Sequence, residues 1–441
     1  MLLFMQYARN FFMATSSNWQ TINKLKTIAM KRFLFLLVLI NSTLFISCND
    51  DDESEYADYI VATPLLVNKA ELRTSVTVIA PIPTETSGKI YAYNDYIFIN
   101  EKYKGVHVID NSNPENPSKI GFITIPGNVD ISVKDNFLYA DSVVDLVVLD
   151  ISNRDEIKEV NRLENALPNN VVWPIAEIYE YAQIDYENQY IIGWETKIER
   201  RKIEEVGGPD IFLEADAIAN QSGGNTGQGG SLARFKIVDE YLYAVDSHNI
   251  NVFNISNLNA PEKLNPIYAG FDIETIFNKG DYLYLGSMQG MFIYNLSDPA
   301  VPSYVSEFRH GTACDPVVVD DNYAYVTLRG GNFCGATESG LYIVDLANIE
   351  APELKVMYPM DEPYGLGIKG NQLFICDGAS GLKVYDTSRV PDLPQLNHFK
   401  DIVTFDVIPL EEQLLMVGDG VLYQYTYTAN NIKLLSEFRL N

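Results

Sequence analysis

One short phrase recurs seven times after residue 100, and it limits the possible folds more than any other feature of the chain. The phrase is a run of four or five apolar residues, then Asp or Asn, then a turn. Repetition at a period of roughly 40–45 residues is the mark of a radial or stacked array of one supersecondary unit. The copies lie at residues 106–110, 146–150, 250–254, 291–295, 341–345, 382–386 and, without the Asp, 421–425.

Each repeat predicts four antiparallel strands. In residues 127–163, strands are expected at 129–133, 137–140 and 146–149 and near 158–160. The third strand is apolar on nearly every residue, so both of its faces must be covered. Four-stranded blades packed around an axis supply that cover. With units starting near residues 88, 128, 233, 271, 314, 363 and 403, the sequence predicts an all-β fold, a seven-bladed β-propeller of four-stranded antiparallel blades over residues 71–441.

Two segments depart from the repeat. Residues 72–80 read as an extra strand, which is a candidate for closing the ring. Residues 164–231 form an inserted excursion: we expect a long hairpin around 190–199 and a flexible Gly-rich loop at 222–230. Insertions in repeat proteins often decorate the binding face, and the alternative is a tolerated insertion without a function.

The charge balance excludes one class of partner. With 32 basic and 59 acidic residues the formal net charge is -27. Nucleic-acid binding needs a basic face that displaces counterions, so we expect no nucleic-acid partner. The same charge repels anionic lipid surfaces.

The N-terminus has the order of a processing segment. Lys31 and Arg32 precede an apolar run at 33–40, and Ser47 precedes Cys48. This order resembles the lipobox of bacterial lipoproteins, in which the cysteine becomes the lipidated first residue. We expect residues 1–47 to be a signal peptide with Met30 as the true start, and residues 48–70 to be a lipidated acidic tether. The alternative is an uncleaved anchor, for which the apolar run is short.

An acidic run at 49–53 follows directly after Cys48. It resembles the export signal of surface-displayed lipoproteins in Bacteroidota-type outer membranes. We therefore expect an outer-membrane lipoprotein exposed at the cell surface, touching the membrane only through its lipid. The alternative is a periplasm-facing protein whose acidic run is a solvated tether.

The repeated phrase resembles that of the LVIVD-repeat family of bacterial β-propeller proteins. The resemblance covers most of residues 88–441, and it is sharpest at 313–316, 325–329, 332–335, 363–368 and 376–378. It implies a propeller fold at the surface or in the periplasm, and no agreed activity.

The remaining cysteines suggest one cross-link. Cys314 opens the first strand of unit five and Cys334 follows its second strand, so both lie at the same end of a hairpin. Outside the cytoplasm we expect a disulfide between them. A metal site that adds His310 is an alternative, but its spacing fits no zinc motif. Cys376, within an apolar strand, is expected to be a buried free thiol.

Acidic residues recur where first strands begin, namely Asp130, Asp272, Asp315 and Asp406. In a propeller these carboxylates ring one mouth of the central channel, and Asp377, just after a second strand, lies at the same end. Converging carboxylates can hold Ca²⁺. The alternative is that they accept hydrogen bonds from backbone N–H groups and stabilise turns.

Two arginines depart from the repeat on this acidic face. Arg329 stands where other units have Asp or Ser, and Arg234 enters unit three. Together they can clamp a carboxylate or sulfate. Tyr364, His310, His248 and Trp194 can add stacking surfaces for a sugar or peptide. The alternative is that both arginines form structural ion pairs with the Asp residues.

No nucleophile elbow, HExxH motif, P-loop or dinucleotide-binding turn is present in the sequence. We therefore expect a binding or assembly module for a partner protein or glycan at the cell surface. The alternatives are a carbohydrate- or metabolite-active enzyme that uses the acidic channel mouth, and a structural role in a surface complex.

Overall fold

The computed structural model describes residues 56–74, 76–85, 87–153, 156–168, 174, 176–181, 183–202, 226, 228–310, 316–330, 338–428 and 431–441. The chain divides into two compact units, residues 1–58 with 200–207 and residues 59–199 with 208–441. The fold described here belongs to the second unit, apart from residues 56–58 and 200–202, which are the ends of two strands. Within the described ranges no helix is long and apolar enough to cross a membrane. The expected signal peptide and Cys48 lie outside these ranges.

The described residues form eight β-sheets. Sheet 1 contains β3 (Ser87–Tyr93), β4 (Tyr96–Glu101), β5 (Gly105–Asp110) and β6 (Ser118–Thr124), with β2 (Thr77–Ile79) and β13 (Gln228–Gly229) on its edges. Sheet 2 contains β7 (Ile131–Lys134), β8 (Phe137–Ser142), β9 (Asp145–Asp150) and β10 (Lys158–Leu163). Sheet 3 contains β14 (Phe235–Val238), β15 (Tyr241–Val245), β16 (Asn249–Asn254), β17 (Glu262–Lys263) and β18 (Ile267–Tyr268).

Sheets 4 to 7 are regular four-stranded meanders. Sheet 4 contains β19 (Phe277–Lys279), β20 (Tyr282–Ser287), β21 (Gly290–Asn295) and β22 (Ser303–Arg309); sheet 5 contains β23 (Val317–Val319), β24 (Tyr323–Leu328), β25 (Gly340–Asp345) and β26 (Glu353–Pro359). Sheet 6 contains β27 (Leu366–Lys369), β28 (Gln372–Cys376), β29 (Leu382–Asp386) and β30 (Gln395–Phe399); sheet 7 contains β31 (Asp406–Pro409), β32 (Gln413–Gly418), β33 (Val421–Thr428) and β34 (Asn431–Arg439).

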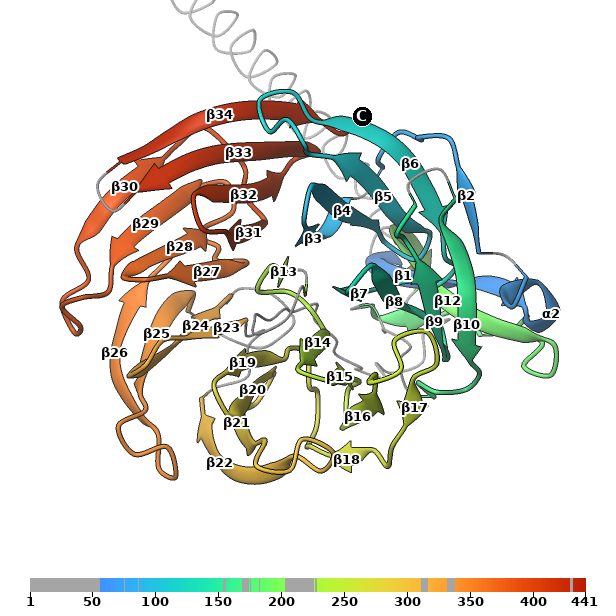
Figure 1. Ribbon diagram of the computed structural model, residues 1–441, viewed down its shortest axis with the longest axis horizontal. Helices are drawn as coiled ribbons and strands as arrows, with labels where there is room; N and C mark the ends of the chain where they lie inside the picture. Colours follow the sequence, from blue (N-terminus) through green and yellow to red (C-terminus); the bar gives the residue numbers. More distant parts are fainter. Residues whose placement is uncertain are drawn as a thin grey trace, which may run out of the picture. The chain divides into compact units, whose positions relative to one another are not determined.

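The first strands of sheets 1 to 7 contact one another in a closed cycle. The cycle runs from β3 through β7, β14, β19, β23, β27 and β31 back to β3. Figure 1 shows them nearest a common centre, with the later strands of each sheet successively farther out. The expected all-β, propeller-like architecture is therefore confirmed. The first strands begin within six residues of the unit starts that the repeat predicts, and all but that of sheet 4 within three.

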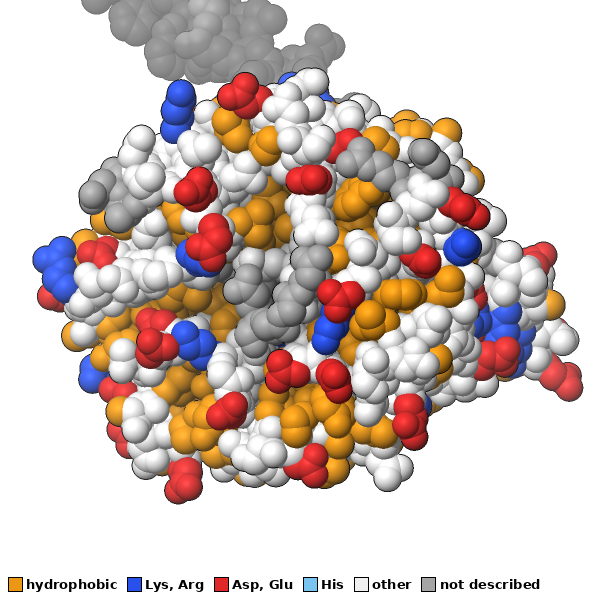
Figure 2. Space-filling view, in the orientation of Figure 1, with side chains coloured by type: hydrophobic (Ala, Val, Ile, Leu, Met, Phe, Trp, Pro, Cys, Tyr) orange, Lys and Arg blue, Asp and Glu red, His pale blue; other side chains and the backbone are white. Residues whose placement is uncertain are grey.

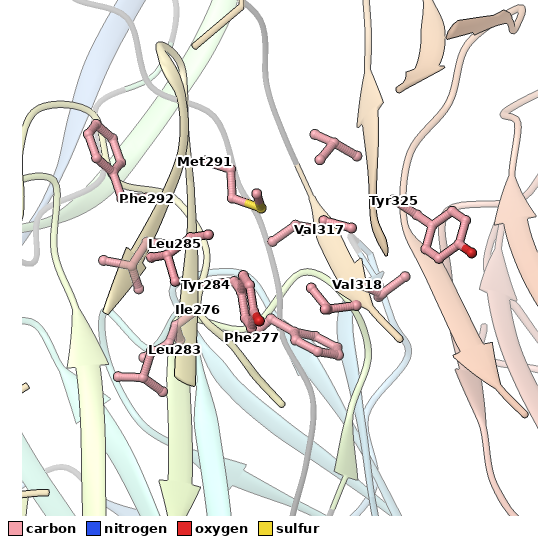
Figure 3. Packing of buried hydrophobic residues seen from close by; sticks show 14 of the residues in the cluster. Ile276, Phe277, Leu283, Tyr284, Leu285, Met291, Phe292, Val317, Val318 and Tyr325 are labelled. Carbon is pink, nitrogen blue, oxygen red and sulfur yellow. The ribbon is translucent and has the colours of Figure 1, made fainter. Parts of the chain in front are cut away.

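Apolar side chains fill the space between neighbouring sheets. Figure 3 shows this packing between sheets 4 and 5, where Phe277 and Tyr284 lie toward Val317 and Val318 of the next sheet. The third strand of sheet 2 is covered on both faces, because residues 146–149 are all fully buried. This explains why the repeated phrase is continuously apolar instead of alternating.

The Asp or Asn that ends the phrase closes a turn in six sheets. Its side-chain oxygen accepts a hydrogen bond from the backbone N–H two residues later, at 2.9 Å for Asp110 and Ser112. The same bond recurs at Asp150, Asn254, Asn295, Asp345 and Asp386. In sheet 7, which lacks this residue, β33 and β34 instead continue pairing as far as Thr428 and Asn431.

A β-bulge follows at a constant place. In sheets 1, 2, 4, 5, 6 and 7 the register between the third and fourth strands shifts by one residue near the end of the phrase. In sheets 2 and 4 to 7 the fourth strand is an outer edge, and a bulge twists an edge so that it pairs poorly with another chain.

The extra strand does not close the ring as expected. Residues 69–72 form the helix α2 (Lys69–Leu72), and β2 pairs with β6 on the outer edge of sheet 1. It makes no pairing with sheet 7, so the prediction was wrong. The reason is that sheets 1 and 7 are each complete, and their first strands already meet.

The eighth sheet differs from two other predictions, the tether at residues 48–70 and the hairpin around residues 190–199. It contains β11 (Ile178–Tyr179), β1 (Tyr56–Asn68) and β12 (Gln189–Lys202) in that order. Thus residues 56–68 are a strand and not part of a tether, and residues 190–199 pair with this N-terminal strand instead of forming a hairpin of their own. Because the two partners are far apart in sequence, local pattern gave no sign of the pairing.

Candidate functional site

The ring sheets have two ends, which we name by their connections. At the start face the first strands begin and the second strands end; at the turn face each first strand turns into the second. All the Asp and Arg candidates belong to the start face by sequence. Over sheet 2 this face is covered, because Tyr190 and Ile192 of the eighth sheet pack with Val143 and Val144.

A segment of the insertion lies among the first strands. Residues 228–234, expected to begin as a flexible loop, are all buried, and β13 pairs antiparallel with the first strand β3. Thr226 bridges to Lys134 at the turn face, whereas the backbone N–H of Leu366, at the start of β27, donates to Ser231 Oγ at 2.5 Å. The segment therefore runs from the turn face to the start face, and we name residues 228–234 the central segment.

Glycine permits this close approach. A Cβ atom on Gly230 would lie 2.2 Å from Asp406 Oδ2, and one on Gly229 would lie 3.3 Å from the Tyr91 ring. A side chain at residue 230 would therefore displace the carboxyl group beneath it. The Gly-rich composition that suggested flexibility serves packing here.

Two of the channel carboxylates are structural. Asp130 accepts backbone hydrogen bonds from Ile131 at 2.8 Å and Phe235 at 3.0 Å, and also from Arg234. Asp406 accepts them from Val407 at 2.8 Å and from Ile90 at 3.4 Å. Each carboxylate thus joins its own first strand to that of the next sheet, which is the alternative that sequence reasoning left open.

Burial shifts the acidity of both groups. Desolvation raises the pKa of Asp130 to about 6, although Lys89, with Nζ at 3.9 Å, counteracts this shift. Desolvation likewise raises the pKa of Asp406 to about 7, against the hydrogen bonds from Val407 and Ile90 and the charge of Lys89. Lys236 on β14 is also buried, which lowers its pKa to about 7.

Of the other metal candidates, only Asp272 is described, and it does not join them. Asp272 is half-buried on a loop between sheets 3 and 4, and Asp315 lies outside the described residues. Within the described residues no group of three or more His, Cys, Asp or Glu side chains is placed to hold a metal ion. Ca²⁺ binding stays a prediction from the sequence.

The two arginines are separated by burial. Arg234 is 5% exposed and belongs to the central segment, so it does not stand on the open face. Arg329 is half-buried, and its guanidinium carbon lies 4.2 Å from the centre of the Tyr364 ring. Within the described residues no carboxylate lies within ion-pair distance of Arg329, so the expected two-arginine clamp is replaced by one stacked guanidinium.

Tyr364 is held firmly under this guanidinium. Its hydroxyl donates to Glu362 Oε1 at 2.9 Å, and its ring lies 5.3 Å from that of Phe405. Its backbone carbonyl accepts from Thr327 Oγ1 at 2.9 Å. Burial raises the pKa of Tyr364, whereas Arg329 opposes that shift.

Asp377 lies at the base of the neighbouring loop. Its fully buried carboxylate accepts backbone hydrogen bonds from Asp361 at 3.1 Å and Glu362 at 2.7 Å, and it pairs with Lys383. Lys383 also reaches Asp361 at 3.2 Å. Asp377 thus positions the loop that carries Glu362, and its carboxylate is already engaged by these backbone groups and Lys383.

The aromatic candidates differ in exposure. The half-buried His310 ring lies 6.1 Å from Phe308 and 6.4 Å from Tyr342. Trp194 is buried in the eighth sheet with Ala62 and Ala176, so it offers no stacking surface. On the face in Figure 2, Lys and Arg side chains are scattered among Asp and Glu and form no basic patch.

Of the cysteines, the structure describes only Cys376. It is buried and free, and burial raises its thiol pKa well above the ordinary value. Cys314 and Cys334 lie outside the described residues, so their disulfide stays a prediction.

A cavity at the turn face was not anticipated from the sequence. It has a volume of about 940 Å³ and lies among the first hairpin turns of sheets 4, 5 and 6. Lys279, Asp321, Lys369 and Asn371 line it, and Lys279 pairs with Asp321 at 2.8 Å. The only sequence sign is the recurrence of Gly or Asn in these turns.

Comparison with known protein families finds a known repeat in three segments of the chain. The pattern described as the LVIVD repeat matches residues 86–124, 127–164 and 310–359. The chain contains LVIVD repeats. They correspond to sheets 1, 2 and 5, the last of which carries Arg329, and the remaining ring sheets have the same strand order. No curated protein matches the chain significantly.

Several solved structures are similar to this chain at 10–11% identity. A protein from Lactobacillus plantarum is 11% identical with a TM-score of 0.49, and the match covers 80% of this chain and 96% of that one. Kluyveromyces lactis Hsv2 is 10% identical with a TM-score of 0.48, covering 81% and 100%. Saccharomyces cerevisiae Sqt1 is 11% identical with a TM-score of 0.48, covering 81% and 87%.

Proposed function

We propose that this protein is a binding module of the cell surface, which recognises a carboxylate- or sulfate-bearing group of a glycan or partner protein at its start face. In this proposal it is a seven-bladed propeller with the eighth sheet as an accessory, held at the outer membrane by lipid on Cys48. The described fold begins at Tyr56, shortly after that cysteine.

The observation that carries the proposal is the state of Arg329. In a chain with a net charge of -27, a guanidinium stacked at 4.2 Å over Tyr364 has no carboxylate within ion-pair distance among the described residues. A guanidinium presents a planar set of donors that fits a carboxylate or sulfate with two parallel hydrogen bonds. The stack holds that plane in place before a ligand arrives, which lowers the entropy cost of binding.

The burial of Asp130 and Asp406 favours a binding module over an enzyme that would use the channel carboxylates. Asp130 and Asp406 are engaged by backbone N–H groups, and the central segment lies against both. A general acid or base must come within hydrogen-bond reach of its substrate, and these two groups are buried.

Binding of acidic glycans tests the proposal. We would measure the affinity of the full chain for arrayed uronic-acid and sulfated oligosaccharides and acidic peptides, beside neutral parents of the same length. Arg329→Ala is expected to weaken binding of the acidic member by about tenfold or more, because a charge-assisted pair contributes about 1.5–3 kcal/mol. Tyr364→Phe keeps the ring and is expected to retain most of the affinity, whereas Tyr364→Leu is not.

Arg309→Ala is the matched control. Arg309 is an exposed arginine already paired with Glu307 at 2.6 Å, so its loss removes one positive charge without touching the stack. Equal losses in Arg309→Ala and Arg329→Ala would show a general charge effect and contradict the proposal. Absence of binding to every acidic probe would contradict it too.

A further inference from the structure

A loop between sheets 3 and 4 holds one aromatic side chain out into solvent. Gly270 and Asp272 flank Phe271, and both adopt left-handed backbone conformations with φ of 137° and 53°. Hydrogen bonds from Ala269 N–H to His248 O at 2.7 Å and from Ile273 N–H to Ser247 O at 3.1 Å tie the loop to sheet 3. The conformation is therefore fixed on both sides of Phe271.

The ring of Phe271 belongs to a small exposed aromatic group. Phe271 is 56% exposed and Tyr268 is 59% exposed. The Phe271 ring lies 5.4 Å from His248 and 6.0 Å from Tyr268, with interplanar angles of 77° and 85°. Edge-to-face contacts of this kind fix the rings relative to one another. A phenylalanine is ordinarily buried, whereas here a loop with two positive-φ residues holds the Phe271 ring in water beside two further rings.

Polar groups stand at the side of these rings. The side chain of Gln289 lies beside the carboxyl group of Asp272, and burial raises the pKa of that carboxyl group while the charge of His248 opposes the shift. Ser287 Oγ donates to the backbone oxygen of Phe271 at 3.1 Å. A carboxyl and an amide side by side supply the acceptors and donors that neighbouring hydroxyl groups require.

We propose that Phe271, Tyr268 and His248 form a stacking subsite for a pyranose ring of a neutral glycan. The ring packs its C–H face on the aromatic group, and Asp272 with Gln289 binds its hydroxyl groups. A sugar matches both features at once, because one face of the ring is apolar and its rim is polar. This inference goes beyond the proposed function and does not depend on Arg329.

The test uses the full chain and an array of neutral oligosaccharides of glucose, mannose, galactose and xylose, none of which carries a carboxylate. We expect at least one of them to bind, and Phe271→Ala to weaken that binding by about tenfold or more. Tyr304→Ala is the matched control, because Tyr304 is 54% exposed but lies on the outer strand β22. It is expected to bind as the unchanged protein does.

Gly270→Ala is a second test variant, in which the three aromatic side chains are unchanged. At φ of 137° an alanine is strained, and its Cβ would lie 3.4 Å from Phe292, so the loop is expected to shift and the affinity to fall while the folded state persists by circular dichroism. Binding that is unchanged in Phe271→Ala overturns the proposal. The absence of any bound neutral sugar also overturns the proposal. So does tighter binding of choline chloride than of the sugar, because aromatic groups also bind quaternary ammonium ions.

Discussion

At the scale of single residues, the buried carboxylates predict how stability depends on pH. The pKa of Asp406 in the folded chain is about 7, above the ordinary value, so between about pH 4 and pH 7 the folded state binds a proton that the unfolded state has lost. Stability therefore falls as the pH rises through this window. Asp406→Asn is expected to remove its own share of that fall, which cannot exceed about 1.4 kcal/mol per pH unit for one group. The share of Asp130, whose pKa is about 6, remains.

Urea denaturation midpoints of both proteins across pH 4–8 measure this difference. Asp386→Asn is the control, because hydrogen bonds that Asp386 accepts from Ser388 lower its pKa. Its contribution is complete above its unfolded pKa, so its effect is expected to be constant from pH 5 upward. Parallel profiles of the unchanged chain and Asp406→Asn would contradict the assignment to Asp406.

Gly230 provides a second prediction at this scale. A Cβ there would meet the Asp406 carboxylate at 2.2 Å, so Gly230→Ala is expected to destabilise the fold by about 1–3 kcal/mol, the ordinary cost of overpacking. Gly121→Ala is the control, because its nearest contacts are ordinary ones at 3.5 and 3.6 Å. The free energy of unfolding in urea decides between them. A Gly230→Ala protein that is as stable as the control would contradict the close approach of Gly230 to the Asp406 carboxylate.

At the scale of elements, the central segment links first strands that are otherwise distant in sequence. It pairs with β3, and Ser231 Oγ accepts the hydrogen bond from Leu366 N–H at the start of β27. Ser231→Ala leaves that buried N–H without its acceptor, which is expected to cost about 1–3 kcal/mol. Hydrogen exchange at Leu366 should accelerate by more than exchange elsewhere in β27. Ser297→Ala, at an exposed turn, is expected to change neither quantity.

The same element shows what sequence can and cannot predict. The Asp110 turn and the continuously apolar third strands were predictable, because hydrogen bonding and burial there are local to one repeat. The central segment was not, since glycines such as Gly230 favour a flexible loop unless distant strands enclose them. Asp130 was placed at the correct strand start, but only the contact with Phe235 shows that its carboxylate serves the fold. Arg234 and Arg329 look equivalent in sequence, and burial alone separates them.

At the scale of the whole second unit, the ring closes where sheet 7 meets sheet 1. Leu440 is fully buried at this seam, and its carbonyl accepts a hydrogen bond from Thr84 N–H at 3.1 Å. Gln424 donates to Asn111 at 2.6 Å and Ser436 donates to Pro114 at 2.6 Å, so side chains also cross the seam. Because none of the described strands of one sheet is inserted into the other, closure depends on these contacts and on the packing of β3 against β31.

Leu440→Ala is therefore expected to weaken closure as well as packing. Truncating a fully buried leucine costs about 2–5 kcal/mol, and here the cavity would lie between the first and last sheets of the ring. Hydrogen exchange should consequently rise on both sides of the seam, in β3 and in β31, before it rises in sheet 4. Leu434→Ala on β34 is the matched control: Leu434 is exposed, and its removal should change neither stability nor exchange. If Leu440→Ala instead loosened every sheet equally, the seam would be no weaker than any other junction between neighbouring sheets, and closure would be a property of the whole ring.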